Sequence, residues 1–118
     1  MNKEELEERL INFSVLIIEI TNEMPDKKAA NHLSGQIIRS GTSPALNYGE
    51  AQSAESRKDF IHKIKIVLKE LRETFVCLKI IKRAKLFKSQ EKIDKALIEN
   101  NELISIFVRS VETAQKRN

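Results

Sequence analysis

The chain has 118 residues, of which 41% are hydrophobic and 32% are charged, and its formal net charge is +4. This length suits a single domain, residues 1–118, and the composition excludes a disordered chain. No apolar run reaches the ~20 residues that a membrane-spanning helix needs. Only three Gly and two Pro occur, so long helices are expected instead of many short strands.

The first predicted helix, Lys3 to Glu23, carries more apolar surface than one core needs. Asn2 can cap its N-terminus. From Leu10 to Ile20 apolar residues cover most of its circumference: Leu10, Ile11, Phe13, Val15, Leu16, Ile17, Ile18 and Ile20. A helix with so little polar surface is buried on more than one side. We therefore expect this helix to pack in the core and also between subunits of a homo-oligomer.

The second predicted helix, Lys27 to Gln52, is rich in small residues that let a neighbouring backbone approach closely. Pro25 ends the first helix and Asp26 is the expected cap of the second. Pro44 lacks the N–H that a helix interior uses, so we predict a kinked but continuous helix. The run from Arg39 to Ser43 suggests two roles, an anion site or hydroxyl groups that satisfy the backbone at the kink. The second role is preferred.

The third and fourth predicted helices span Ser56 to Lys85 and Ser89 to Ala114. Ser56 with Asp59 forms a capping box, and Ser89 is the expected cap of the last helix. Short turns join all four helices. The sequence therefore predicts an all-α fold, an antiparallel up-down-up-down four-helix bundle.

Positive charge is concentrated in residues 57–88, which hold eleven Lys and Arg against three acids, a net +8, whereas the rest of the chain is net acidic. On the third helix the basic residues share one side, opposite the apolar residues. The candidate nucleic-acid-binding residues are Lys58, Lys65, Lys69, Arg72, Lys79 and Arg83, with Arg39 as a weaker candidate. No aromatic residue interrupts this side, so binding is expected to depend on phosphate contacts and to show little sequence preference. The alternative is an ordinary solvated face.

No set of residues assembles a catalytic, cofactor or metal site. Asp59 and His62 have the spacing of one di-iron ligand pair, but such sites need the pair twice and further carboxylates. Cys77 is the single cysteine, which excludes an intrachain disulfide and fits a reducing compartment. Among apolar neighbours it is expected to be inert packing. The first residues are acidic, unlike a signal peptide. We expect a cytoplasmic protein that is not an enzyme, requires no cofactor and does not bind membranes.

The segment from Gln36 to Ala51, QIIRSGTSPALNYGEA, is followed by DFIHK at 59–63 and LKELRET at 68–74. Together these resemble the bacterial four-helix-bundle family named for 23S rRNA intervening sequences, also called the S23 ribosomal protein family. The resemblance implies a ring-like homopentamer and supplies no catalytic residues. It extends to accessory variability proteins of diversity-generating retroelements, which are basic pentamers that associate with a reverse transcriptase and nucleic acid.

Two functions follow from these observations. The first is a non-enzymatic homo-oligomeric bundle that binds RNA or DNA through phosphate contacts of the third helix. The second is a protein-interaction scaffold for an acidic or genetically linked protein partner, such as a reverse transcriptase, without nucleic acid.

Overall fold

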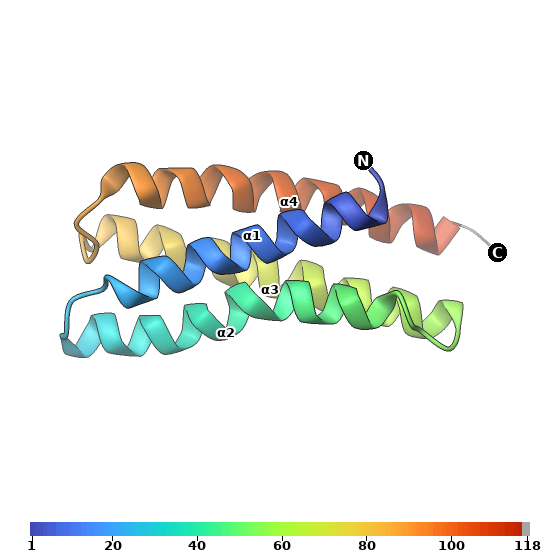
Figure 1. Ribbon diagram of the computed structural model, residues 1–118, viewed down its shortest axis with the longest axis horizontal. Coiled ribbons are helices and arrows are strands. Elements are labelled where there is room, and N and C mark those ends of the chain that lie inside the picture. The colour runs from blue at the N-terminus through green and yellow to red at the C-terminus, as the bar shows by residue number, and fades with distance from the viewer. Residues whose placement is uncertain (117–118) are drawn as a thin grey trace.

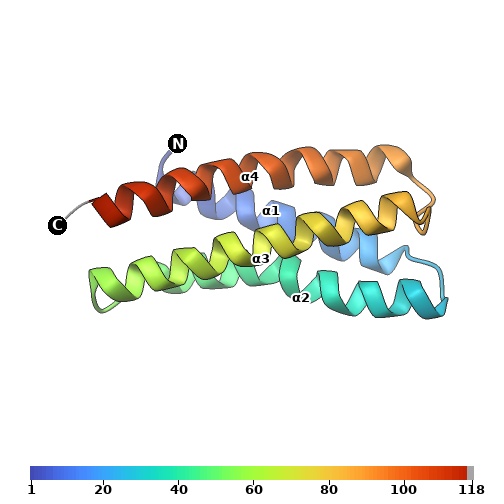
Figure 2. The ribbon, with the colours of Figure 1, turned by 180° about the vertical axis from the view of Figure 1, so that it is seen from behind.

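Four helices form the protein in the computed structural model, which describes residues 1–116 (Figures 1 and 2). They are α1 (Lys3–Asn22), α2 (Lys28–Ala51), α3 (Arg57–Arg83) and α4 (Gln90–Lys116). The chain turns back after each helix, so that consecutive helices run in opposite directions along a body of 49 × 21 × 20 Å. The described residues contain no β-strand. The predicted four-helix bundle is confirmed.

Side-chain caps begin three of the helices where the sequence predicts them. The side-chain oxygens of Asn2, Ser56 and Ser89 accept hydrogen bonds from the backbone N–H three residues on, at 2.8, 3.0 and 3.2 Å. The predicted cap of α2 is wrong. Lys27 occupies the cap position without a side-chain bond. Asp26 lies one residue too early and instead accepts a hydrogen bond from Asn31 Nδ2 at 2.9 Å.

All four helices contribute to one continuous core. Its largest fully buried side chains are Leu10, Phe13, Ile17, Ile20, Ile37, Ile64, Leu71, Leu78, Ile81, Ile93, Leu103 and Phe107. Burial of each such side chain stabilises the fold by about 1.5–3 kcal/mol. Tyr48 and Phe107 meet edge to face, with ring centroids 5.5 Å apart, a preferred aromatic geometry.

Helix α2 remains continuous through Pro44, and Figures 1 and 2 show its axis changing course near its middle. The predicted single, kinked helix is confirmed. Just before the proline, Gly41 is buried against α1. A Cβ atom added to Gly41 would lie 2.8 Å from Cγ2 and 2.9 Å from Cγ1 of Ile17, closer than such carbon atoms pack. The absence of a side chain at Gly41 therefore allows α1 and α2 to approach.

Gly41→Ala should lower the free energy of unfolding by about 1–2 kcal/mol, because overpacking costs more than the helix gains from alanine. The matched control is Gly35→Ala in the same helix, where a Cβ would meet no atom within 4 Å. That variant should gain roughly 0.5–1 kcal/mol from helix propensity. Urea denaturation of both variants and the parent chain measures the difference. Equal effects at the two positions would contradict the close contact with Ile17.

Candidate functional site

The six predicted cations of α3 lie together on its outer side. We call this set the basic face: Lys58, Lys65, Lys69, Arg72, Lys79 and Arg83. Five of them are exposed and Lys79 is half-buried, whereas Ile64, Leu71 and Leu78 on the opposite side of the helix are fully buried. The spacing of three, four and seven residues produces this separation, because it returns each residue to nearly the same side of an α-helix.

The cations of the basic face are not neutralised within the subunit. Among residues 1–116, none of the six forms an ion pair, whereas six other basic residues do: Arg9, Arg39, Lys63, Lys82, Lys88 and Lys92. Unpaired charges of one sign create a stronger external field than paired ones. The basic face therefore carries six cations that no carboxylate among residues 1–116 neutralises in an ion pair.

Two kinds of apolar group border or interrupt the basic face. Lys79 Nζ lies 4.8 Å from the centroid of the Phe75 ring, a cation–π contact. Phe75 is half-buried at the edge of this surface, so an aromatic ring borders the cations without interrupting them. The helical spacing of Phe75 is that of the core residues. In the structure its ring instead lines the hollow between α3 and α4 and stays partly exposed to solvent. Val76 and Ile80 lie among the cations and are 55% and 46% exposed.

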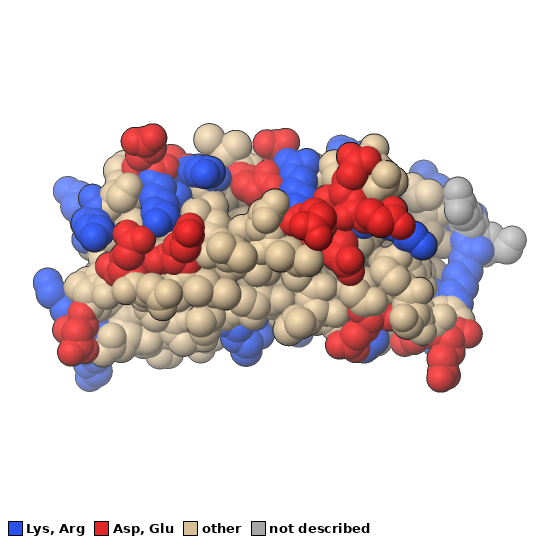
Figure 3. Space-filling view, in the orientation of Figure 1, with Lys and Arg blue, Asp and Glu red and all other residues tan. Residues whose placement is uncertain are grey.

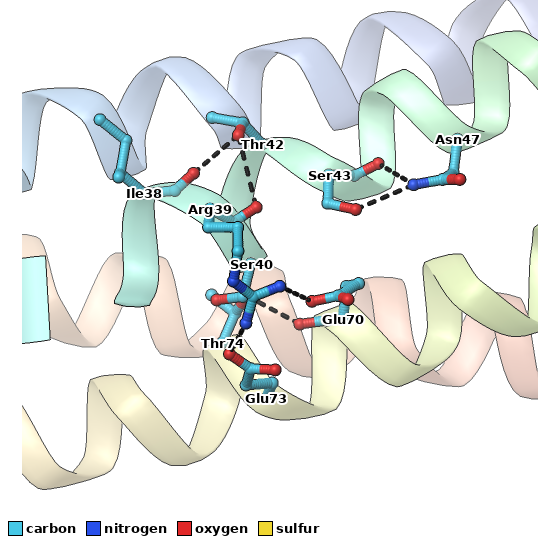
Figure 4. Close-up of polar contacts among 9 residues, drawn as sticks. All are labelled: Ile38, Arg39, Ser40, Thr42, Ser43, Asn47, Glu70, Glu73 and Thr74. Atoms are coloured by element: carbon cyan, nitrogen blue, oxygen red, sulfur yellow. Dashed lines mark hydrogen bonds and ion pairs between the residues drawn. The ribbon is translucent and has the colours of Figure 1, made fainter. Parts of the chain in front are cut away.

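Arg39, the weaker candidate, lies on α2 and is occupied by acidic partners. Its Nη1 atom donates to Glu70 Oε2 at 3.0 Å, and its Nη2 atom donates to Glu73 (Figure 4). These hydrogen bonds, that to Glu73 foremost, raise the pKa of Arg39. The structure therefore does not add Arg39 to the unpaired cations. It places Arg39 beside the two acids that border the basic face.

The hydroxyl groups near Pro44 bond to the protein itself. Thr42 Oγ1 donates to the carbonyl oxygen of Ile38 at 2.6 Å, and Asn47 Nδ2 donates to Ser43 Oγ at 2.8 Å (Figure 4). Ser40 and Thr74, both buried, join α2 to α3 through hydroxyl groups 2.9 Å apart. Because α2 continues through this segment, it offers no helix N-terminus to an anion. The structure favours the backbone-satisfying role over the anion site.

Neither the possible metal ligands nor the cysteine of residues 1–116 forms a site in this structure. Across residues 1–116, no three His, Cys, Asp or Glu side chains lie where they could hold a metal ion together; the exposed His62 and the half-buried Asp59 belong to no such group. Cys77 is buried, and desolvation raises the pKa of its thiol to about 11. A thiol with that pKa is a poor nucleophile at neutral pH. None of the helices described here has the length and hydropathy to cross a membrane.

Two hollows flank α4, and the sequence pattern did not reveal either. The groove between α1 and α4 measures about 960 Å³, and its rim carries the acids Glu19, Glu91, Asp94 and Glu99. The hollow between α3 and α4 measures about 430 Å³ and borders the basic face at Lys79 and Arg83. Acidic side chains therefore predominate around the first hollow, which also has Lys95, and basic side chains line the second.

Figure 3 shows a broad tan band over α1 and α2, with charged side chains along its upper edge, at its ends and at places along its lower edge. On α1 the apolar side chains of Ile11, Val15 and Ile18 are 40%, 47% and 37% exposed, and we call these three residues the uncharged surface. These three residues lie on one side of the helix, away from the fully buried Phe13 and Ile17. The sequence predicted this second apolar side of the first helix.

The chain is similar in sequence to one protein family and in fold to a solved structure. The sequence model of one family, described as 23S rRNA-intervening sequence protein, matches residues 3–109. A similar solved structure is a crystal structure of a protein with unknown function from the S23 ribosomal protein family of Bacteroides thetaiotaomicron VPI-5482. It superposes with a TM-score of 0.85 at 28% identity, over 95% of this chain and 99% of that one. Among curated proteins, none matches the sequence significantly.

Alkylation of Cys77 should be slow in the folded protein. With a pKa of about 11 against an ordinary value of 9.0, the folded thiol holds roughly a hundredfold less thiolate at pH 8. Iodoacetamide at pH 8 should therefore react at least about a hundredfold more slowly with the folded chain than with the urea-unfolded chain.

The raised pKa also has a consequence for stability. The folded state binds the thiol proton more tightly than the unfolded state, so this contribution to stability is complete below pH 9 and declines as pH rises from 9 towards 11. Urea midpoints of the parent chain and of Cys77→Ala, each measured at pH 8 and pH 10, isolate this contribution of the thiol to stability.

For the alkylation experiment, equal rates in the folded and unfolded chains would contradict the burial of Cys77.

Proposed function

The chain belongs to the 23S rRNA-intervening sequence protein family, and on that premise we propose that it is a non-enzymatic, homo-oligomeric bundle that binds RNA or DNA. Contact is made with phosphate groups through the basic face. The observation that carries this proposal is the set of six unpaired cations on one side of α3. The similar Bacteroides protein is described as having unknown function, so the proposal rests on the charges of this chain.

The dimensions of the basic face suit a nucleic-acid backbone. From Lys58 to Arg83 the helix rises about 37 Å, at ~1.5 Å per residue. Duplex DNA carries one negative charge per ~1.7 Å of its axis, so such a face can contact several phosphates at once. Arg39 assists indirectly, because its ion pairs with Glu70 and Glu73 reduce the repulsion that these two carboxylates would exert on an approaching phosphate.

The uncharged surface of α1 supports self-association. Ile11, Val15 and Ile18 are exposed in the single subunit, and a contiguous apolar surface on a helix is typical of a protein–protein contact. A second copy packed on these residues would remove them from water, which accounts for the excess of apolar residues in the first helix. The family resemblance implies five subunits. Several copies of the basic face would strengthen a weak phosphate contact by avidity.

A second candidate function rests on Val76 and Ile80. Both are about half exposed and lie within the basic face. Apolar groups between cations suit an acidic protein surface with its own apolar residues better than they suit a phosphate backbone. In this alternative the bundle is a scaffold for an acidic or genetically linked protein, such as a reverse transcriptase. Unlabelled RNA should displace labelled DNA under the first proposal and should fail to do so under the second.

Lys65→Glu with Lys69→Glu should abolish binding to a short fluorescent RNA hairpin. Replacing two neighbouring cations with carboxylates removes phosphate contacts and adds repulsion, so the affinity at low salt should fall by about a hundredfold or more. Fluorescence anisotropy at several salt concentrations measures this. The parent chain should lose affinity with salt at a logarithmic slope of about −0.9 per phosphate contacted.

The matched control changes charge elsewhere by the same amount. Lys27 and Lys28 are exposed and form no ion pair with any described residue, so Lys27→Glu with Lys28→Glu alters net charge equally and leaves the basic face intact. Similar losses in both double variants would mean that net charge alone drives binding. Unchanged affinity in the Lys65 and Lys69 variant would refute the assignment.

Val15→Asp should dissociate the oligomer. The parent subunit has a mass of 13.6 kDa, and light scattering at micromolar concentration should give a multiple of it. A carboxylate at Val15 would be buried unpaired between subunits, which costs several kcal/mol, so the variant should scatter as a monomer. Val76→Asp is the control: Val76 is 55% exposed on α3, outside the uncharged surface. A monomeric parent chain would overturn the proposal.

A further inference from the structure

The hollow between α3 and α4 combines apolar walls with unpaired cations. We propose, building on the function proposed above, that it receives one unstacked nucleoside phosphate of a single-stranded segment. The base enters the hollow while the flanking phosphates contact the basic face. The volume of about 430 Å³ lies within the range of small-ligand sites, roughly 300–1,000 Å³, and accommodates a nucleobase with its ribose.

The walls of the hollow suit a flat aromatic group. They are formed by Phe75 from α3 and by Leu97 and Ile98 from α4. Phe75 and Leu97 are half-buried and Ile98 is 64% exposed, so part of this apolar surface is open to solvent, while Leu97 also packs against the core. Bases of single strands stack on such aromatic side chains with little sequence preference. The exposed side chain of Asn101 adds an amide donor and acceptor at the rim.

The charge around the hollow selects an anion. Lys79 and Arg83 line it, and neither forms an ion pair within residues 1–116. Lys82 also lines it but pairs with Asp94 Oδ1 at 2.7 Å. The described lining residues include no carboxylate, in contrast to the groove between α1 and α4, which has four carboxylates and one cation, Lys95. The charges therefore favour an anionic aromatic ligand in the α3–α4 hollow over its neighbour.

The position of Lys79 links stacking to phosphate binding. Its ammonium group lies over the Phe75 ring, 4.8 Å from the centroid. When a base stacks on this ring, Lys79 exchanges its cation–π contact for an ion pair with the adjacent phosphate. Because Lys79 belongs to the basic face, a strand that inserts a base here continues along Arg72 and Lys69 on the same side of α3.

Phe75→Leu tests the proposal, because it keeps an apolar side chain and removes the aromatic ring. The probes are a fluorescent twelve-nucleotide single strand and an abasic strand with the same number of phosphates. Anisotropy should show the variant binding the base-bearing strand about tenfold more weakly than the parent chain and the abasic strand equally well. Phe60→Leu is the matched control, since Phe60 is a half-buried residue of α3 outside the hollow. It should bind both strands normally.

Each other outcome overturns the inference in a distinguishable way. Parent-like binding of the base-bearing strand by Phe75→Leu would leave phosphate binding intact and reject base insertion, leaving the hollow to a protein partner. Equal losses for both strands would show that Phe75 only positions Lys79. Displacement of the strand by a free nucleoside monophosphate at a similar concentration would assign the hollow to a mononucleotide. If the parent chain binds neither strand, the proposed function fails together with this inference.

A second measurement uses the unaltered protein and so does not depend on the variant folding. A strand carrying 4-thiouridine, irradiated in complex with the parent chain, should crosslink to the peptide that contains Phe75 or to the one that contains Asn101. Crosslinks confined to other peptides would overturn the proposal.

Discussion

The middle of α2 holds the bundle together, because both neighbouring helices are positioned against it. On one side the missing side chain of Gly41 admits Ile17 of α1, and Ser14 Oγ lies 3.1 Å from the carbonyl oxygen of Gly41 as a hydrogen-bond donor. On the other side Ser40 bonds to Thr74 of α3 at 2.9 Å. A close apolar contact and a buried polar contact one residue apart thus determine how α1 and α3 are placed about α2.

That placement also controls where the charges lie. Arg39 lies beside Ser40 and reaches Glu70 and Glu73 of α3, so the acidic edge of α3 is turned towards α2 and balanced there. The opposite edge of α3 packs beside α4, where Lys82 meets Asp94. The outer side between these edges keeps its cations without partners among the described residues. The same contacts that hold the bundle therefore separate paired charge from unpaired charge, which is the basis of the proposed phosphate binding.

Much of the site could be predicted from helical spacing. Lys58, Lys65 and Lys69 recur on one side of a long amphipathic helix, and helix geometry alone places them together. Contacts between side chains of different helices could not be predicted from helical spacing. Arg39 was a weaker candidate from sequence, but nothing in its spacing predicted the two carboxylate partners that the packing of α2 against α3 gives it. Phe75 shares the spacing of core residues, yet its ring is left accessible beside Lys79.

The sequence by itself determined the four helices, three of their side-chain caps to the residue, the continuity of α2 through Pro44 and the apolar excess of the first helix. Those features follow from local spacing and backbone chemistry, which act within a few residues of one another. Only the tertiary structure decided which charges are neutralised, where hollows open beside α4, and which apolar side chains stay exposed. These properties depend on how far apart two helices pack and how each is rotated about its own axis. Side chains distant in sequence set both through the contacts they make.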